Sequence, residues 1–198
     1  NHAGESWVQR LDAQGFVHAA WPATGKLVAV QPMAGVFADG AGGAHVVGTS
    51  VQTPVYHVDA NDGSIAHLSA FAGSWLAWTN DARGGLLGRA VTVSGHTTVH
   101  ALARLDSLGE AAWSASVAYN LLDLRRSSFD AFRSDGVGGA WAVMRNDTLP
   151  QSAPNTTLTH LDLWHFDSTG VPPASWGGGV PIVISTAVAP SVLDIAPP

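Results

Sequence analysis

The chain has 198 residues, of which 46% are hydrophobic and only 12% are charged, with 22 Gly, 11 Pro and no Cys. This composition is typical of a folded globular chain, and the absence of Cys excludes disulfides, thiolate nucleophiles and Cys-type zinc sites. The formal net charge is -6, and the nine Lys and Arg residues form no basic stripe, so we expect no nucleic-acid partner. No apolar stretch is long enough to predict a membrane span.

One phrase recurs along the chain: an apolar residue and an aspartate, followed by a glycine three or four positions later. Its copies are Leu11-Asp12…Gly15, Val58-Asp59…Gly63, Leu105-Asp106…Gly109 and Phe166-Asp167…Gly170. Successive aspartates are separated by 47, 47 and 61 residues. A period of this size, marked by turn residues, predicts that one supersecondary unit is stacked repeatedly.

A second phrase, out of phase with the first, opens a strand-like run each time. Its copies are Asp39-Gly-Ala-Gly-Gly43, Asp81-Ala-Arg-Gly-Gly85 and Asp135-Gly-Val-Gly-Gly139. An aspartate can bond its own backbone two residues on, and glycine reaches positive φ, so Asp-x-x-Gly-Gly predicts a tight turn feeding a strand. A phosphate cradle is the alternative, but no Lys-Ser/Thr and no helix follow any copy.

The residues around the first phrase predict a two-faced strand. Two positions before each aspartate stands a cation or an imidazole, namely Arg10, His57, Arg104 and His165. Because strand side chains alternate, these share a face with the aspartate, and we expect structural polar contacts there, not catalysis. An aromatic follows each turn, as Trp21, Phe71, Trp113 and Trp176, and we interpret these four as core residues in preference to ligand platforms.

Two segments depart from the repeat. Residues 116–132 contain Leu and Phe residues interspersed with Asp and Arg, and the spacing of the apolar residues predicts a short helix. This segment lies in the interval that lengthens the last period to 61 residues. Residues 145–155 are polar and carry proline, which indicates an exposed loop.

The phrases Trp7-Val-Gln-Arg-Leu-Asp-Ala-Gln-Gly15, with Trp21 after them, and Ser134-Asp-Gly-Val-Gly-Gly-Ala-Trp-Ala-Val143 resemble the blade repeats of large secreted bacterial β-propeller-like proteins. The resemblance implies an all-β fold, a β-propeller-like array of about four antiparallel blade repeats or a segment of a larger propeller. It also implies export, to a secreted or cell-surface location in a bacterium. The expected units are 1–35 (partial), 36–80, 81–134 and 135–198, within one domain. The half-units at the two ends either close on each other or mark a piece of a longer chain or assembly.

The sequence holds no strong catalytic or metal-binding pattern. No Gly-x-Ser-x-Gly elbow occurs. His96 and His100 have the spacing of a helical zinc pair but lead into an alternating strand, where residues four apart are about 13 Å apart. Asp59-Ala-Asn-Asp-Gly63 offers oxygen ligands for Ca²⁺, yet an Asx turn is the favoured interpretation. We therefore assign no catalytic residue, no metal site and no cofactor.

Two function classes remain from the sequence. The favoured one is a non-catalytic extracellular module that binds a protein or glycan partner or builds a surface assembly. The alternative is a propeller-type carbohydrate-active hydrolase or lyase, or a glycan-binding lectin. Four large side chains are not required by the repeat pattern, and we take them as the candidate binding residues: Trp75, Trp78, Trp141 and Arg145. The competing interpretation is that these tryptophans fill space between units.

Overall fold

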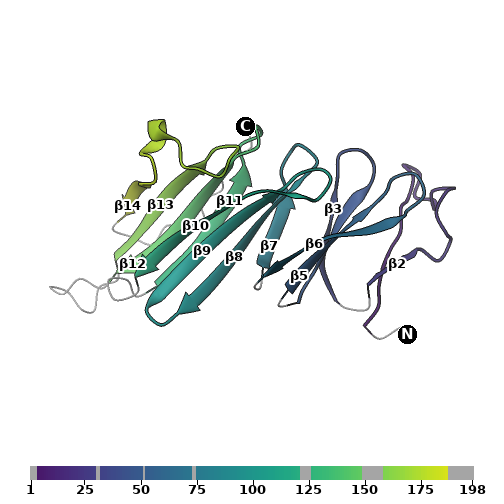
Figure 1. The fold of residues 1–198 in the computed structure, drawn as a ribbon, viewed down its shortest axis with the longest axis horizontal. Helices are drawn as coiled ribbons and strands as arrows, with labels where there is room; N and C mark the ends of the chain where they lie inside the picture. Colours follow the sequence, from purple (N-terminus) through teal and green to yellow (C-terminus); the bar gives the residue numbers. More distant parts are fainter. Residues whose placement is uncertain are drawn as a thin grey trace.

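The computed structural model describes residues 4–29, 32–50, 52–72, 75–120, 126–148 and 158–186. In this part of the chain the fold is all-β, as expected, and consists of antiparallel sheets (Figure 1). The one helical segment among the described residues is the 3₁₀ turn η1 (Ala174–Trp176). No described helix has the length or apolarity to cross a membrane.

Three of the sheets have four strands each, and one sheet has two. The N-terminal sheet holds β1 (Ser6–Val8) and β2 (Lys26–Ala29). Sheet I holds β3 (Met33–Ala38), β4 (Ala44–Gly48), β5 (Gln52–Val58) and β6 (Ile65–Ala72). Sheet II holds β7 (Trp75–Asn80), β8 (Leu86–Ser94), β9 (Thr97–Leu105) and β10 (Ala111–Asn120). Sheet III holds β11 (Arg126–Ser134), β12 (Ala140–Thr148), β13 (Leu158–Phe166) and β14 (Ile182–Thr186).

Within each four-stranded sheet, strands that are consecutive in the chain are neighbours in the sheet. Each Asp-x-x-Gly-Gly phrase joins the first strand to the second, and each aspartate of the other phrase directly follows a third strand. In an antiparallel meander these two turns lie at the same end of the sheet. The predicted equivalence of Asp59, Asp106 and Asp167 is therefore confirmed, and Asp12 likewise follows the Leu11–Val17 bridge.

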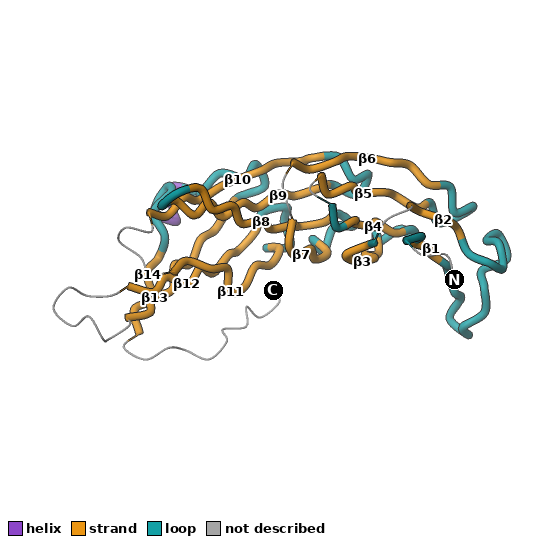
Figure 2. Tube along the Cα trace, turned by 90° about the horizontal axis from the view of Figure 1, so that it is seen from below, coloured by secondary structure: helices purple, strands orange, loops and turns teal. Residues whose placement is uncertain are grey.

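The sheets stand side by side in chain order, and the row bends into an arc (Figure 2). The described residues do not close into a barrel or a propeller. The sheets begin at β3, β7 and β11, one strand ahead of the Asp-x-x-Gly-Gly turns. The expected units 81–134 and 135–198 therefore each begin one strand later than sheets II and III, and the expected unit 36–80 begins within β3 but includes β7 of sheet II.

The short helix predicted over 116–132 is wrong. Residues 116–120 belong to β10 and residues 126–132 to β11, while 121–125 lie outside the described residues. The ladder shifts register between Phe129 and Ala131. This bulge places Phe129 and Phe132, three positions apart, against the same core, so it imitates helical spacing.

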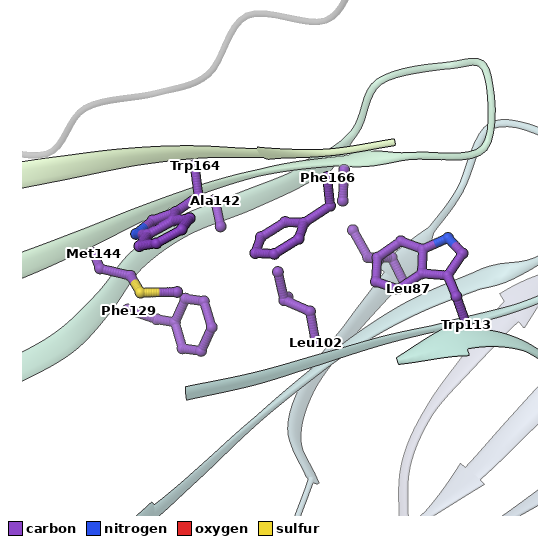
Figure 3. Packing of buried hydrophobic residues seen from close by; sticks show 9 residues of the cluster. Leu87, Leu102, Trp113, Phe129, Ala142, Met144, Trp164 and Phe166 are labelled. Atoms are coloured by element: carbon purple, nitrogen blue, oxygen red, sulfur yellow. The ribbon is translucent and has the colours of Figure 1, made fainter. Parts of the chain in front are cut away.

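The core lies between the sheets. Leu87 and Leu102 of sheet II meet Met144 and Phe166 of sheet III, and Trp113 packs beside them (Figure 3). A second cluster joins sheets I and II, and a third joins sheet I to the N-terminal sheet. Apolar residues thus stabilise the contact between neighbouring sheets, while the turns set how closely the sheets approach.

Candidate functional site

The recurrent aspartates share one pattern of hydrogen bonds. In six of them, Oδ1 accepts the backbone N–H groups of the residues two and four positions on, at 2.7–3.1 Å. These six are Asp12, Asp39, Asp81, Asp106, Asp135 and Asp167. At Asp59 the turn is one residue longer, and Oδ1 accepts the N–H of Asn61 at 2.7 Å. The Asx-turn interpretation of residues 59–63 is therefore confirmed.

In each four-stranded sheet, the second oxygen of the Asp-x-x-Gly-Gly aspartate meets the cation or imidazole that stands two positions before the other recurrent aspartate. The sequence predicted that this residue shares a face with that other aspartate, whereas its polar contact is with the Asp-x-x-Gly-Gly aspartate. His57 Nε2 lies 3.0 Å from Asp39 Oδ2, and His165 Nε2 lies 3.2 Å from Asp135 Oδ2. In sheet II, Arg104 donates from Nε and Nη2 to Asp81 Oδ2, at 2.7 and 2.6 Å. The aspartate therefore joins its own turn to the third strand of its sheet.

These pairs are held apart from one another, as predicted. His57, Arg104 and His165 each belong to a different sheet, and Arg10 donates instead to the carbonyl oxygen of Ala60. Among the described residues, no group of three or more His, Cys, Asp or Glu is arranged to hold a metal ion. The pairs are structural contacts that repeat with the sheets.

The electrostatics of these turns stabilise the ionised aspartate. Burial alone would raise the pKa of Asp39, but the hydrogen bonds from His57 and from two backbone N–H groups lower it below its ordinary value of 3.8. The same causes lower the pKa of Asp135, with His165 as its partner. Both carboxylates are therefore ionised at neutral pH. They accept hydrogen bonds and have no proton to donate as a general acid.

Two of the four predicted core aromatics are confirmed as core. Trp21 and Trp113 are buried, and Trp113 Nε1 donates to the carbonyl oxygen of Gly138 in the next sheet at 2.9 Å. The side chain of Phe71 lies outside the described part. Trp176 differs, because it sits half-buried on η1 and not on a fourth strand.

Trp75 and Trp78 lie between sheets I and II. Trp78 is buried in the cluster formed with Val47, Leu86 and Leu105, and Trp75 packs against that cluster. Their ring centroids are 5.4 Å apart. The burial of Trp78 agrees with the space-filling interpretation, and a binding role for Trp75 stays a prediction.

Trp141 and Arg145 lie together on one face of sheet III. Their neighbours Ala140, Ala142 and Met144 pack against sheet II, so the two side chains project from the opposite face, which we call the outer face. The Trp141 ring stacks on His165, with centroids 4.0 Å apart and planes 17° apart. Trp176 stands across Trp141 at 74° and 4.6 Å.

Arg145, farther along β12, bonds an acid of the neighbouring strand. Its Nε and Nη2 donate to Asp130 Oδ2 at 3.2 and 2.9 Å. The outer face therefore combines an aromatic cluster with a partly exposed ion pair, and it brings together two of the four candidate residues.

A buried polar network that the sequence did not predict joins sheets II and III. Tyr119 Oη donates to Asp162 Oδ2 at 2.7 Å, and Asn146 Nδ2 donates to the same oxygen at 2.8 Å. Trp164 Nε1 donates to Tyr119 Oη at 3.0 Å. Burial and the bond to Asp162 raise the pKa of Tyr119. In the sequence, the alternation of Asp162 with apolar residues was the one indication of this network, because the partners of Asp162 lie far from it along the chain.

We expect Tyr119→Phe to lower the free energy of unfolding by about 2 kcal/mol. The change leaves the ring in place but removes the hydroxyl that bonds both Asp162 and Trp164, and both lose a buried partner. Urea unfolding followed by tryptophan fluorescence measures the change. A loss below about 0.5 kcal/mol, the size expected of a neutral surface substitution, would show that the network carries little stability.

Comparison with protein-family models, curated proteins and solved structures finds no match.

Proposed function

We propose that this chain is a non-catalytic binding module for a protein partner, which it contacts through the outer face of sheet III. The observation that supports this most directly is the cluster of Trp141, His165 and Trp176 on that face. Tryptophan and arginine are enriched among residues that dominate binding energies, and Arg145 lies on the same face.

The equivalent positions in the other sheets explain why Trp141 stands out. Counted from the turn aspartate, His45 and Leu87 occupy the place of Trp141, and both are fully buried where the next sheet packs. Trp141 is half-buried, and no described sheet covers the outer face. At the position that elsewhere contacts the next sheet, Trp141 is therefore partly exposed, although Val143 and Leu161 on the same face are buried.

The geometry of the cluster favours a protein over a glycan. Sugar rings bind tryptophan by stacking on an open aromatic face. One face of Trp141 is already covered by the imidazole of His165, and Trp176 stands nearly perpendicular to both rings. Ring edges and the flanking Arg145 suit contacts with protein side chains, so the lectin alternative has less support.

The hydrolase or lyase alternative also has less support. An enzyme of that kind needs acidic and basic groups that converge on one cleft. The two Asp–His pairs of the turns, Asp39–His57 and Asp135–His165, lie in separate sheets, and each holds a turn of its own sheet.

The scaffold we propose is a β-propeller-like array in which each four-stranded sheet is a blade. Consecutive antiparallel meanders standing in an arc support it, as does the resemblance of the repeats to secreted bacterial proteins (Figures 1 and 2). The same resemblance supports a secreted or cell-surface location.

Affinity capture from the source organism's extracellular fraction tests the proposal. We expect the unaltered chain to retain a partner that Trp141→Ala with Arg145→Ala binds at least 30-fold more weakly, since a hot-spot side chain contributes about 2 kcal/mol. Val93→Ala, at an exposed position of sheet II, serves as the control and should bind normally. Equal binding by all variants, or binding to a glycan array lost in the double variant, would contradict a protein-binding outer face.

A further inference from the structure

Asp162 combines deep burial with a carboxylate oxygen that receives no hydrogen bond from the described residues. Its side chain is only 5% exposed. Oδ2 accepts hydrogen bonds from Tyr119 and Asn146, whereas Oδ1, which is also buried, has no donor in the described part of the chain. A carboxylate oxygen taken out of water without a donor or a cation is costly. A positively charged partner at Oδ1 would remove that cost.

Comparison with the Asp–His pairs of the turns shows how Asp162 differs. Asp39 Oδ1 accepts two backbone N–H groups, and its Oδ2 lies 3.0 Å from His57 Nε2. Asp135 is bonded in the same way by its own turn and histidine. Asp162 Oδ1 has no such backbone donors, and His160 Nε2 stands 3.7 Å away, beyond hydrogen-bonding distance. The imidazole is thus beside the carboxylate without being bonded to it.

The separation of His160 Nε2 and Asp162 Oδ1 suits two ligands of one metal ion. The two residues stand two positions apart on β13, so their side chains share the face that meets sheet II. Zinc binds imidazole nitrogen and carboxylate oxygen at about 2.0–2.2 Å, and at a tetrahedral angle two such ligands are about 3.4 Å apart. The two atoms therefore need to approach by only about 0.3 Å. His160 is partly exposed, which gives an ion a path from solvent.

Asn146 adds a second buried oxygen to this cluster. It stands directly opposite His160 in the ladder between β12 and β13, is fully buried, and donates its Nδ2 to Asp162. The opposite orientation of the amide would place its oxygen against the carboxylate, so this bond fixes which atom is which. Asn146 Oδ1 also has no donor among the described residues. The cluster therefore holds two buried acceptor oxygens and an imidazole nitrogen, and a cation is the partner that all three can share.

We infer that His160 Nε2 and Asp162 Oδ1 bind a divalent transition-metal ion such as Zn²⁺, with Asn146 Oδ1 as the third ligand and water completing the coordination. Because Asp162 also bonds Tyr119 of sheet II, the ion stabilises the contact between sheets II and III. With one histidine and one aspartate, the site has fewer of these residues than the three that identify most zinc centres. It lies on the inner face of sheet III and does not depend on the function proposed for the outer face.

Titration of zinc chloride into the full chain, first treated with a chelator, tests the inference. We expect calorimetry to show saturable binding of one ion per chain and the melting temperature to rise with zinc, since an ion that binds only the folded chain stabilises it. His160→Ala should weaken binding by about tenfold or more, because even a residue that only supports a ligand contributes that much. Asp162→Asn should cause a similar loss. Its amide oxygen can keep the bonds from Tyr119 and Asn146, while its amide nitrogen has no electron pair for the ion.

Two histidine variants serve as matched controls. His96→Ala removes an exposed imidazole between β8 and β9, and His57→Gln changes an Asp–His pair whose oxygens already have donors. Both should bind zinc as the unaltered chain does. Circular dichroism and melting without zinc establish that each variant is folded. Zinc binding that survives both His160→Ala and Asp162→Asn would overturn the inference, because the ion would then be held by other imidazoles. No saturable binding at millimolar zinc would also overturn it, and water would then be the partner of Asp162 Oδ1.

Discussion

Replacing Gly84 by alanine is expected to lower the free energy of unfolding by about 4 kcal/mol. Gly84 has φ of +84°, where a side chain costs about 1–2 kcal/mol. A Cβ there would also meet the carbonyl oxygen of Asp39, in the turn of the preceding sheet, far inside van der Waals contact. The atom met is backbone and cannot swing away, so sheets I and II must separate, with a cost like that of overpacking a core.

Gly15→Ala is the matched control. Gly15 has φ of +86°, nearly the same as Gly84, but an added Cβ would meet nothing within 4 Å. We expect a loss of about 1 kcal/mol, the backbone cost alone. Urea unfolding of both variants measures the two losses. Losses of equal size would show that the contact between the turns of sheets I and II does not limit stability.

The turns could be predicted from the sequence because their chemistry is local. The carboxylate of each turn aspartate binds N–H groups two and four positions away, so the phrase itself contains both donor and acceptor. Alternation predicted that Arg104 shares a face with Asp106, two positions on, whereas the structure pairs Arg104 with Asp81, 23 positions away. The repeat thus recorded that a structural polar contact recurs at this position, but it did not record which aspartate forms the contact.

Contacts between sheets could not be predicted, because no repeated phrase records them. Asp162 looks like an ordinary strand residue until β10 brings Tyr119 against it. His45 binds the carbonyl oxygen of Gly84 in the next sheet, at 3.1 Å, where sheet II has Leu87. The residues that join neighbouring sheets thus differ from one interface to the next.

Bulges in the first strands also obscured the pattern. In β7 the register shifts between Trp75 and Ala77, so Trp75 and Trp78 reach the same core although they are three positions apart. In sequence this spacing does not fit a simple alternating strand. The two tryptophans were candidates for binding because they exceed the one aromatic residue per unit that packing was expected to require.

The pH dependence of stability is expected to centre on His100. This residue of β9 is buried between sheets II and III, where its Nε2 lies 2.7 Å from Ser127 Oγ and its ring meets Phe129 edge-on. Burial, with the nearby charge of Arg89, lowers the pKa of His100 from about 6.5 to about 4. The unfolded chain therefore binds a proton between pH 6.5 and 4 that the folded chain excludes, so stability falls as the pH falls.

Over that window the loss due to His100 is about 3 kcal/mol, at 1.36 kcal/mol for each unit of pKa difference. His100→Leu, which copies the buried Leu161 of sheet III, should remove this part of the slope. Ser127→Ala should keep it, because the cause is mainly burial and not the hydroxyl. Urea unfolding at half-unit steps from pH 4 to 7.5 yields the three curves. If His100→Leu and the unaltered chain lose stability in parallel, the imidazole is not held neutral by the packing of sheets II and III.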